Sequence, residues 1–170
     1  ASSLDAPRRA VTVALNASLI PYIDALIRAV HGILIKHKIA APLMVVKGDG
    51  SLISAKMALQ RPVETVISGP AASVIGACHL GDVNSGIVAD MGGTTTDISI
   101  VTGGRPVVSE KGTLIGNWKP MVETVQVFSI GLGGDSEAGY KGGKGLGIGP
   151  RRVIPMSLLG YRYPDVLERL

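Results

Sequence analysis

Apolar residues recur every three or four positions from residue 16 to residue 38 of the chain. This spacing predicts one long amphipathic helix. Lys36, His37 and Lys38 close the segment, and their charges suit the negative end of a helix dipole. Residues 1–12 lack the pattern, so we expect an entry segment or the remnant of a strand there.

Shorter elements are predicted after this helix. Residues 43–46 form a short apolar run typical of a buried strand, and Gly48-Asp49-Gly50 is typical of a turn. Residues 54–59 fit a short helix. Residues 68–79 fit another helix, with Pro70 in its first turn, where a missing N–H group is harmless.

The middle of the chain holds three successive strand-like segments: an apolar run that ends in an acid at 86–90, an alternating segment at 96–102, and a short segment at 106–110. Glycine pairs separate them, Gly92-Gly93 and Gly103-Gly104. This arrangement predicts an antiparallel β-meander. Together with the flanking helices, it predicts a mixed α/β fold.

The C-terminal part is rich in glycine. Residues 122–130 alternate again and predict a further strand. Residues 131–149 carry nine glycines without a repeat period, which we interpret as a loop and a hairpin. Residues 164–170 are expected to form one or two terminal helical turns.

The composition is apolar for a soluble domain. Hydrophobic residues make up 46% of the 170 residues and aromatic residues only 4%, and the mean hydropathy is +0.36. One domain of ordinary size fits this length. We expect part of its apolar surface to be covered by other segments, and the isolated chain to self-associate through it.

The distribution of charged, apolar and cysteine residues argues against nucleic-acid binding, a membrane span and an internal disulfide. The net charge is +4, but the basic residues are scattered. The two pairs of adjacent arginines, Arg8-Arg9 and Arg151-Arg152, are interpreted as solvated surface. Nucleic-acid binding is not expected, because no basic stripe is interleaved with aromatic residues. Residues 11–30 are interrupted by Asn16, Pro21, Asp24 and Arg28, so no membrane span is expected. Cys78 is the only cysteine, which excludes an internal disulfide and is compatible with the cytoplasm.

The segment Ala-Asp-Met-Gly-Gly-Thr-Thr-Thr-Asp-Ile-Ser-Ile-Val, residues 89–101, carries the clearest chemistry. It predicts a strand, a tight turn and a strand. Gly92, Gly93, Thr94 and Thr95 offer N–H and hydroxyl donors that suit phosphate oxygens, and the Asp90 carboxylate can hold Mg²⁺ or its waters. The alternative is an ordinary hairpin in which the polar residues serve the turn.

A second glycine-rich element, Gly-Leu-Gly-Gly-Asp-Ser at residues 131–136, follows a predicted strand. We expect a helix after it, whose N-terminal N–H groups would attract anions. Gly133, Gly134 and Asp135 are therefore candidate nucleotide contacts. The alternative is a plain helix start in which Asp135 or Ser136 is the N-cap.

These motifs resemble a known family. Residues 90–100 are similar to the second phosphate hairpin of the actin, sugar kinase and heat-shock chaperone ATPase superfamily. Residues 42–55 and 61–72 resemble the hydantoinase A/5-oxoprolinase family, and the likeness runs from about residue 16 to residue 149. The family's typical Gly-Ala-Gly-Gly-Gly-Ser element stands here with an acid, Asp135, whose role is open.

The resemblance implies an actin-like ATPase (ribonuclease H-like) lobe, with a mixed sheet, an antiparallel meander and flanking helices. Relatives begin with a further phosphate hairpin that residues 1–170 lack. We therefore expect one partial domain excised from an ATP-binding subunit.

The implied activity is the ATP- and Mg²⁺-dependent opening of a cyclic amide, together with a hydantoinase B-type subunit. Asp90 would serve the reaction and bind the metal. Three alternatives stay open: an acetone or acetophenone carboxylase-like subunit, a chaperone- or actin-like nucleotide switch, and a non-catalytic interaction domain.

Overall fold

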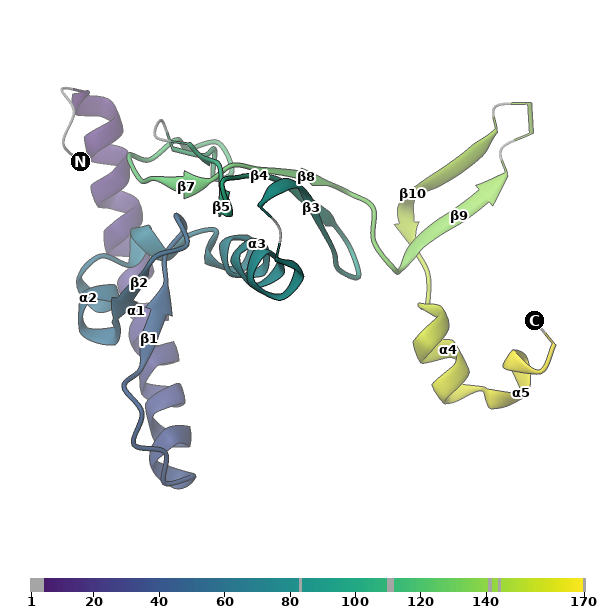
Figure 1. The fold of residues 1–170 in the computed structure, drawn as a ribbon, viewed down its shortest axis with the longest axis horizontal. Helices are drawn as coiled ribbons and strands as arrows, with labels where there is room; N and C mark the ends of the chain where they lie inside the picture. The colour runs from purple at the N-terminus through teal and green to yellow at the C-terminus, as the bar shows by residue number, and fades with distance from the viewer. Residues whose placement is uncertain (1–4, 83, 110–111, 141, 144, 170) are drawn as a thin grey trace. The chain divides into compact units, whose positions relative to one another are not determined.

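The computed structural model describes residues 5–169 except 83, 110–111, 141 and 144 (Figure 1). The chain divides into two compact units. Unit 1 comprises residues 1–88 and 99–126, and unit 2 comprises residues 89–98 and 127–170. The division falls within two adjacent strands, so each unit is built from separate stretches of the sequence.

Helix α1 (Ala6–Lys36) opens unit 1. It begins earlier than predicted, because the Asp5 side chain caps it by accepting a hydrogen bond of 3.0 Å from the N–H of Arg8, and Pro7 occupies its first turn. The expectation of an entry segment or strand is therefore wrong for residues 6–12, and residues 1–4 lie outside the described residues. Thr12 is buried and accepts a hydrogen bond of 2.8 Å from the N–H of Met121.

By length and composition alone, α1 is long and apolar enough to cross a membrane, although core helices and signal sequences meet the same criterion. Its polar residues make protein contacts. The Asn16 side chain donates to the carbonyl of Gln60 at 3.1 Å and accepts from the N–H of Val63 at 3.2 Å. These bonds fasten the helix to the following segment of unit 1.

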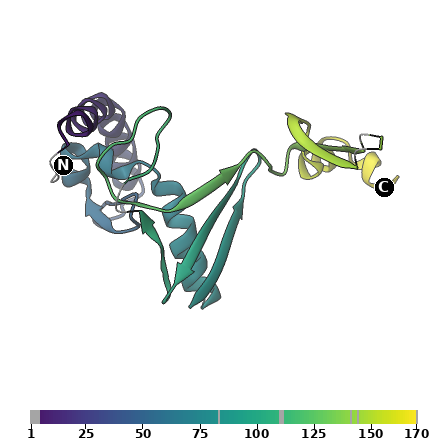
Figure 2. The ribbon, with the colours of Figure 1, turned by 90° about the horizontal axis from the view of Figure 1, so that it is seen from above.

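Strands β1 (Met44–Val46) and β2 (Leu52–Ser54) pair antiparallel. Helix α2 (Ala55–Gln60) follows, capped by the Ser54 hydroxyl, and the 3-10 helix η1 (Pro62–Thr65) leads to α3 (Ser68–Gly81). The predicted strand, turn and two helices are confirmed. Helix α3 packs against β1 and against two strands of the later sequence (Figure 2).

The predicted meander is confirmed in the strands β3 (Ser85–Met91), β4 (Thr96–Thr102) and β5 (Arg105–Pro106), which lie in this order. Gly103 and Gly104 turn the chain with φ of 61° and 71°, values that glycine adopts without steric cost.

The third strand of the meander is shorter than expected. It ends at Pro106, and β6 (Val108–Ser109) pairs with β7 (Thr124–Val125) instead. Residue 110 of the predicted strand lies outside the described residues. The predicted strand 122–130 is likewise divided at Gln126, whose N–H donates to the carbonyl of Val107 at 2.8 Å. Its second part, β8 (Val127–Ile130), pairs with β4.

The rest of unit 2 begins with a hairpin of β9 (Ser136–Tyr140) and β10 (Leu146–Arg152). This confirms the predicted loop and hairpin. The helix expected after Asp135 is wrong, because the chain continues in extended conformation as β9. Helix α4 (Met156–Arg162) was not predicted, and α5 (Pro164–Leu167) is the predicted terminal turn.

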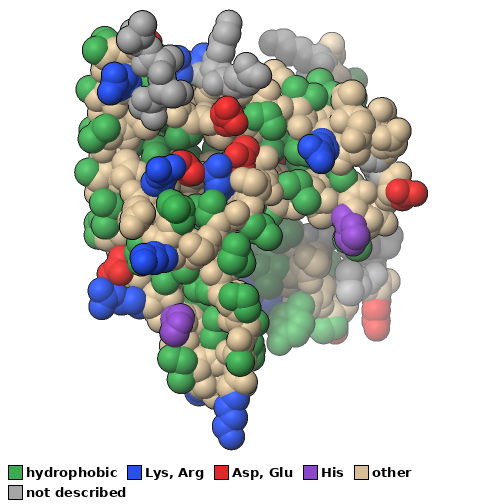
Figure 3. Space-filling view, turned by 60° about the vertical axis from the view of Figure 1, so that its left-hand side comes forward, with side chains coloured by type: hydrophobic (Ala, Val, Ile, Leu, Met, Phe, Trp, Pro, Cys, Tyr) green, Lys and Arg blue, Asp and Glu red, His purple; other side chains and the backbone are tan. Residues whose placement is uncertain are grey.

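The buried core is small and made of small residues: Ala58, Val63, Ala71, Val74, Val101, Val122 and Val125. Larger apolar side chains stay exposed, among them Ile87 on β3 and Phe128 on β8, at 73% and 66%. Hydrophobic side chains also lie among the charged ones over the visible face in Figure 3. This exposure agrees with the expectation that other protein covers part of the surface.

A charged cluster holds the β1–β2 turn to η1. The Lys47 ammonium lies 2.9 Å from Asp49 and 3.5 Å from Glu64, and all three side chains are mostly buried. The hydrogen bond to Asp49 raises the pKa of Lys47 against the opposing effect of burial. Burial alone would raise the pKa of Asp49, but hydrogen bonds from Lys47 and Ser51 outweigh it and lower that pKa.

We expect Lys47→Met to reduce the free energy of unfolding by about 1–3 kcal/mol at pH 7, because it leaves the mostly buried Asp49 carboxylate without a cation and Glu64 with only the more exposed Arg61. The depressed pKa of Asp49 means that its contribution is complete above the ordinary pKa of 3.8 and is lost as the pH falls through the folded-state value. The variant should therefore lose less stability on acidification. Urea unfolding between pH 7 and pH 3 measures both effects.

The matched control is Arg28→Met, which breaks the exposed i,i+4 pair of Arg28 with Asp24 on α1. Such surface pairs contribute about 0–1 kcal/mol. Equal losses in the two variants would show that the Lys47 cluster does not stabilise the turn.

Candidate functional site

The predicted phosphate hairpin forms at the end of β3 and the start of β4. The N–H of Gly92 donates to the carbonyl of Thr95 at 2.9 Å, which closes a tight turn over Gly93 and Thr94. Asp90 is the last residue but one of β3, and its side chain is exposed. The expected strand–turn–strand is therefore confirmed, with its four candidate phosphate contacts on the exposed turn.

The second glycine-rich element lies directly on this turn. The N–H of Gly134 donates to the carbonyl of Gly92 and the N–H of Asp135 to that of Gly93, both at 2.9 Å. The Thr96 hydroxyl donates to the carbonyl of Leu132 at 2.6 Å, across 36 residues of sequence. The structure thus brings all the predicted site residues together within unit 2.

Glycine is required where the two elements meet. A Cβ atom on Gly133 would lie 2.4 Å from the carbonyl carbon and oxygen of Gly93 and 2.5 Å from the nitrogen of Thr94. A Cβ atom on Gly93 would lie 2.6 Å from Oδ1 of Asp135. A side chain at Gly133 would force the two backbones apart, whereas one at Gly93 would displace the Asp135 carboxylate, so this contact explains both glycines structurally.

The donors of the turn fit an anion. Among the described residues, the N–H groups of Gly93 and Thr94 and the hydroxyls of Thr94 and Thr95 have no protein acceptor. The residues of the turn are exposed, and its backbone is held by the hydrogen bonds from Gly134 and Asp135. Successive N–H groups of this kind form an anion-binding concavity.

The acids of the hairpin differ in their surroundings. Asp97 accepts a hydrogen bond from the Ser129 hydroxyl and so ties β4 to β8. Asp90 is exposed, and the described residues contain no group of three metal-ligating side chains. Asp90 therefore fits Mg²⁺ only in the usual manner of nucleotide sites, with phosphate and water as the other ligands.

Asp135 is 8% exposed and is bound by a residue that sequence reasoning missed. Both Nε, at 3.0 Å, and Nη2 of Arg152 donate to its Oδ2 atom. Arg152 is exposed, as the interpretation of Arg151-Arg152 as solvated surface expects, but it also pairs with the buried Asp135. An acid inside a glycine loop was the one available signal that a cationic partner was needed.

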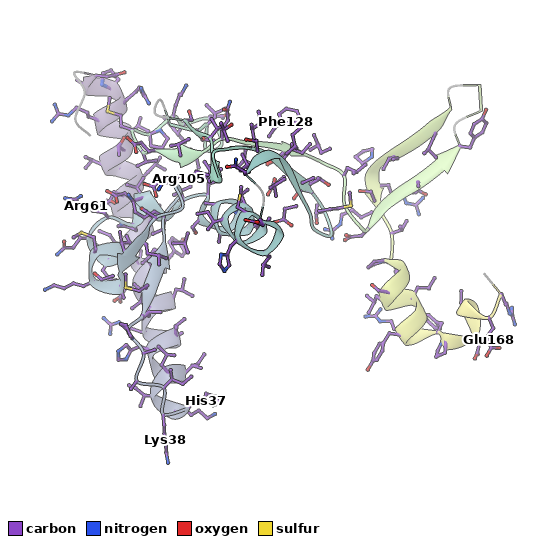
Figure 4. All side chains as sticks on the ribbon, in the orientation of Figure 1. His37, Lys38, Arg61, Arg105, Phe128 and Glu168 are labelled. Carbon is purple, nitrogen blue, oxygen red and sulfur yellow. The ribbon has the colours of Figure 1, made fainter. Side chains whose placement is uncertain are left out.

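A cavity of about 940 Å³ opens in unit 1 between the β1–β2 turn, α3 and β5. Its polar lining includes Asp49, His79, Arg105 and Glu123, and Figure 4 labels Arg105 beside α3. None of the predicted site residues lines it. Free turn donors, rather than cavity size, identify the hairpin as the candidate site.

Comparison with known proteins agrees with this geometry. The chain is 30% identical over 146 residues to caprolactamase subunit alpha of Pseudomonas jessenii, covering 84% of this chain and 21% of that protein. It is 27% identical over 156 residues to an uncharacterised protein of Methanocaldococcus jannaschii, covering 84% and 23%. The chain thus spans about a fifth of the length of these relatives.

Among solved structures, the chain is similar to nucleotide-free acetone carboxylase, from work on the mechanism of ATP-dependent acetone carboxylation. The TM-score is 0.51 at 26% identity, over 65% of this chain and 16% of that chain. This likeness confirms the predicted fold class, a mixed α/β structure with an antiparallel meander. The hydantoinase/oxoprolinase family profile matches residues 9–155, so the chain belongs to that family.

Proposed function

We propose that this chain is part of the ATP-binding subunit of an ATP-dependent enzyme that opens cyclic amides. The stacked glycine turn and glycine loop carry the proposal, because they fix a row of free N–H and hydroxyl donors on one exposed surface. A similar protein is named a caprolactamase subunit, and a similar structure is described as ATP-dependent. The first supports a cyclic amide as substrate, and the second supports a reaction driven by ATP.

The chemistry follows from the substrate class. An amide carbonyl is a poor electrophile because its nitrogen donates electrons into it. Transfer of the γ-phosphoryl group from ATP to the carbonyl oxygen releases ADP and makes the carbon electrophilic. Water adds to that carbon, and the ring C–N bond breaks as the nitrogen takes up a proton. Hydrolysis of the resulting acyl phosphate gives the open-chain acid and inorganic phosphate. The turn around Gly93 and Thr94 would hold phosphate oxygens, and Asp90 would hold Mg²⁺, which neutralises phosphate charge when bound.

We propose that a second lobe and a partner chain, beyond residues 1–170, take part in the reaction. A second phosphate hairpin, in another lobe of the same protein, would close on the nucleotide, so that this chain supplies a partial domain. The word "subunit" in the relative's name supports a partner chain, which we propose to be of the hydantoinase B type. The likeness to acetone carboxylase favours a second candidate, in which an enol oxygen accepts the phosphoryl group.

The test is phosphate release by the intact protein with its partner subunit, in the presence of ATP and Mg²⁺. We expect caprolactam, a hydantoin or 5-oxoproline to stimulate release at least about tenfold. Stimulation by acetone or acetophenone instead would support the carboxylase-like candidate. ATP binding with no stimulation by any of them would favour a nucleotide switch, and no ATP binding would favour an interaction domain.

The chain of residues 1–170 alone serves as the control. It carries one recognised phosphate hairpin, and half of a two-lobed clamp cannot align the γ-phosphate with an acceptor, where a displacement of ~1 Å costs about 100-fold in rate. We therefore expect weak ATP binding and no phosphate release. Tight binding with steady release from this chain would contradict the two-lobe proposal.

A further inference from the structure

A negative charge lies unexpectedly close to the anion-binding turn. Oδ1 of Asp135 is 2.6 Å from the position that a Cβ atom on Gly93 would take. This oxygen is buried, and no described residue hydrogen-bonds to it. Because repulsion between like charges is strong where water is excluded, an uncompensated carboxylate here would oppose the binding of phosphate to the turn.

The end of β10 supplies the compensating charge. Nε and Nη2 of Arg152 both donate to Oδ2 of Asp135, the carboxylate oxygen farther from Gly93, 3.5 Å from the position of a Cβ atom there. The next residue, Val153, donates its N–H to the carbonyl of Asp135 at 2.7 Å. The strand end therefore holds Asp135 by both its side chain and its main chain.

The pair is asymmetric in its exposure to solvent. The Asp135 side chain is 12% exposed and that of Arg152 is 60% exposed. Removal of the arginine would leave a carboxylate that water cannot solvate, whereas removal of the carboxylate would leave a cation that water can. The two deletions must therefore have different consequences for an anion on the turn.

We infer that Arg152 is a positioning residue of the phosphate site, which neutralises Asp135 and so allows the turn at Gly93 to accept a polyphosphate. The inference rests on the proposed function. It assigns a role to Asp135, the acid by which this glycine loop differs from the typical element of the family. Arg152 acts through Asp135 and needs no contact with the nucleotide.

The experiment measures the dissociation constant of ATP for the intact protein in magnesium-containing buffer. We expect Arg152→Gln to raise it by about tenfold or more, since removing the arginine leaves the charge of the buried Asp135 carboxylate uncompensated beside the turn. Adding Asp135→Asn to the Arg152→Gln variant should recover most of this loss, and Asp135→Asn alone should weaken binding less than Arg152→Gln does. The matched control, Arg151→Gln, breaks only the exposed pair with Glu137 and should leave the constant unchanged.

This pattern of ATP affinities distinguishes charge compensation from a purely structural role of the Asp135–Arg152 pair. If the pair only braced the loop, Asp135→Asn would weaken binding as much as Arg152→Gln, and the double variant would not recover. Either result overturns the inference. An Arg152→Gln variant whose dissociation constant for ATP equals that of Arg151→Gln overturns it as well. Should Arg152→Gln fail to fold, Arg152→Lys carries the test: it keeps the charge, and loss of ATP binding by this folded variant overturns the inference.

Failure of the proposed function has a different signature. Wild-type protein that binds no ATP refutes the proposed function, and the inference with it. Wild-type protein that binds ATP, with the four variants lacking the expected asymmetry, refutes the inference alone.

Discussion

Replacing Asp90 by asparagine is expected to lower the ATP-dependent turnover of the intact protein by at least about 100-fold, with the fold intact. Asp90 is exposed at the end of β3 and makes no contribution to the core, so the change should cost little stability. A neutral amide binds Mg²⁺ far more weakly than a carboxylate, and loss of a catalytic cation removes several kcal/mol of transition-state stabilisation. Turnover as a function of Mg²⁺ concentration, with circular dichroism as the check on folding, measures the effect.

The control is Asp97→Asn, on the neighbouring strand. Asp97 accepts a hydrogen bond from the Ser129 hydroxyl, and asparagine keeps an oxygen that can accept it. We expect turnover within about threefold of the wild type, as for a surface change that preserves its hydrogen bond. Unchanged Mg²⁺-dependent turnover in a folded Asp90→Asn variant would remove Asp90 from the site.

A single methyl group on Gly133 is expected to abolish measurable nucleotide binding. The new Cβ atom would overlap the backbone at Gly93 and Thr94, at 2.4–2.5 Å, and backbone atoms cannot rotate away as a side chain can. The loop must therefore lift from the turn, breaking the bonds from Gly134 and Asp135. We expect a loss of about 1–3 kcal/mol in stability and about 100-fold or more in ATP affinity, measured by calorimetry.

Gly131→Ala provides the matched control in the same loop. A Cβ atom there meets nothing within 4 Å, so stability and affinity should remain near those of the wild type. Equal behaviour of the two alanine variants would mean that the close contact at Gly133 does not shape the site.

Local patterns predicted most of the elements. An apolar run predicted β3, alternating residues predicted β4, and paired glycines predicted both turns, because each of these patterns is encoded within a few residues. The start of α1 was predicted too late, because the prediction relied on the spacing of apolar residues and did not use Asp5, whose side chain caps the helix. The helix expected after the loop at residues 131–136 was wrong because the following residues form β9 and pair with β10. This pairing joins two segments of the chain and is not encoded in the loop itself.

The assembly of the candidate site was only partly accessible from sequence. Each glycine-rich element could be identified alone, since its residue types suit an anion. Their direct contact through Gly92 and Gly134 depends on the tertiary fold, and so does the pairing of Asp135 with Arg152. Long-range pairing has no local signature, and an exposed arginine pair in the sequence is most often solvated surface.

The separation in sequence between the two glycine elements also sets the order in which the site can be completed on the ribosome. A hairpin forms in about 1–10 μs once its residues are free, so the turn at Gly93 can close early. Leu132, which accepts from Thr96, is 36 residues further along, or about 2–7 s of synthesis at ~5–20 residues per second. Arg152 follows Asp135 by 17 residues more. The nascent protein therefore carries the turn at Gly93 for seconds before the loop that contacts it is made, and a chain that stops before β10 lacks the arginine that pairs with Asp135.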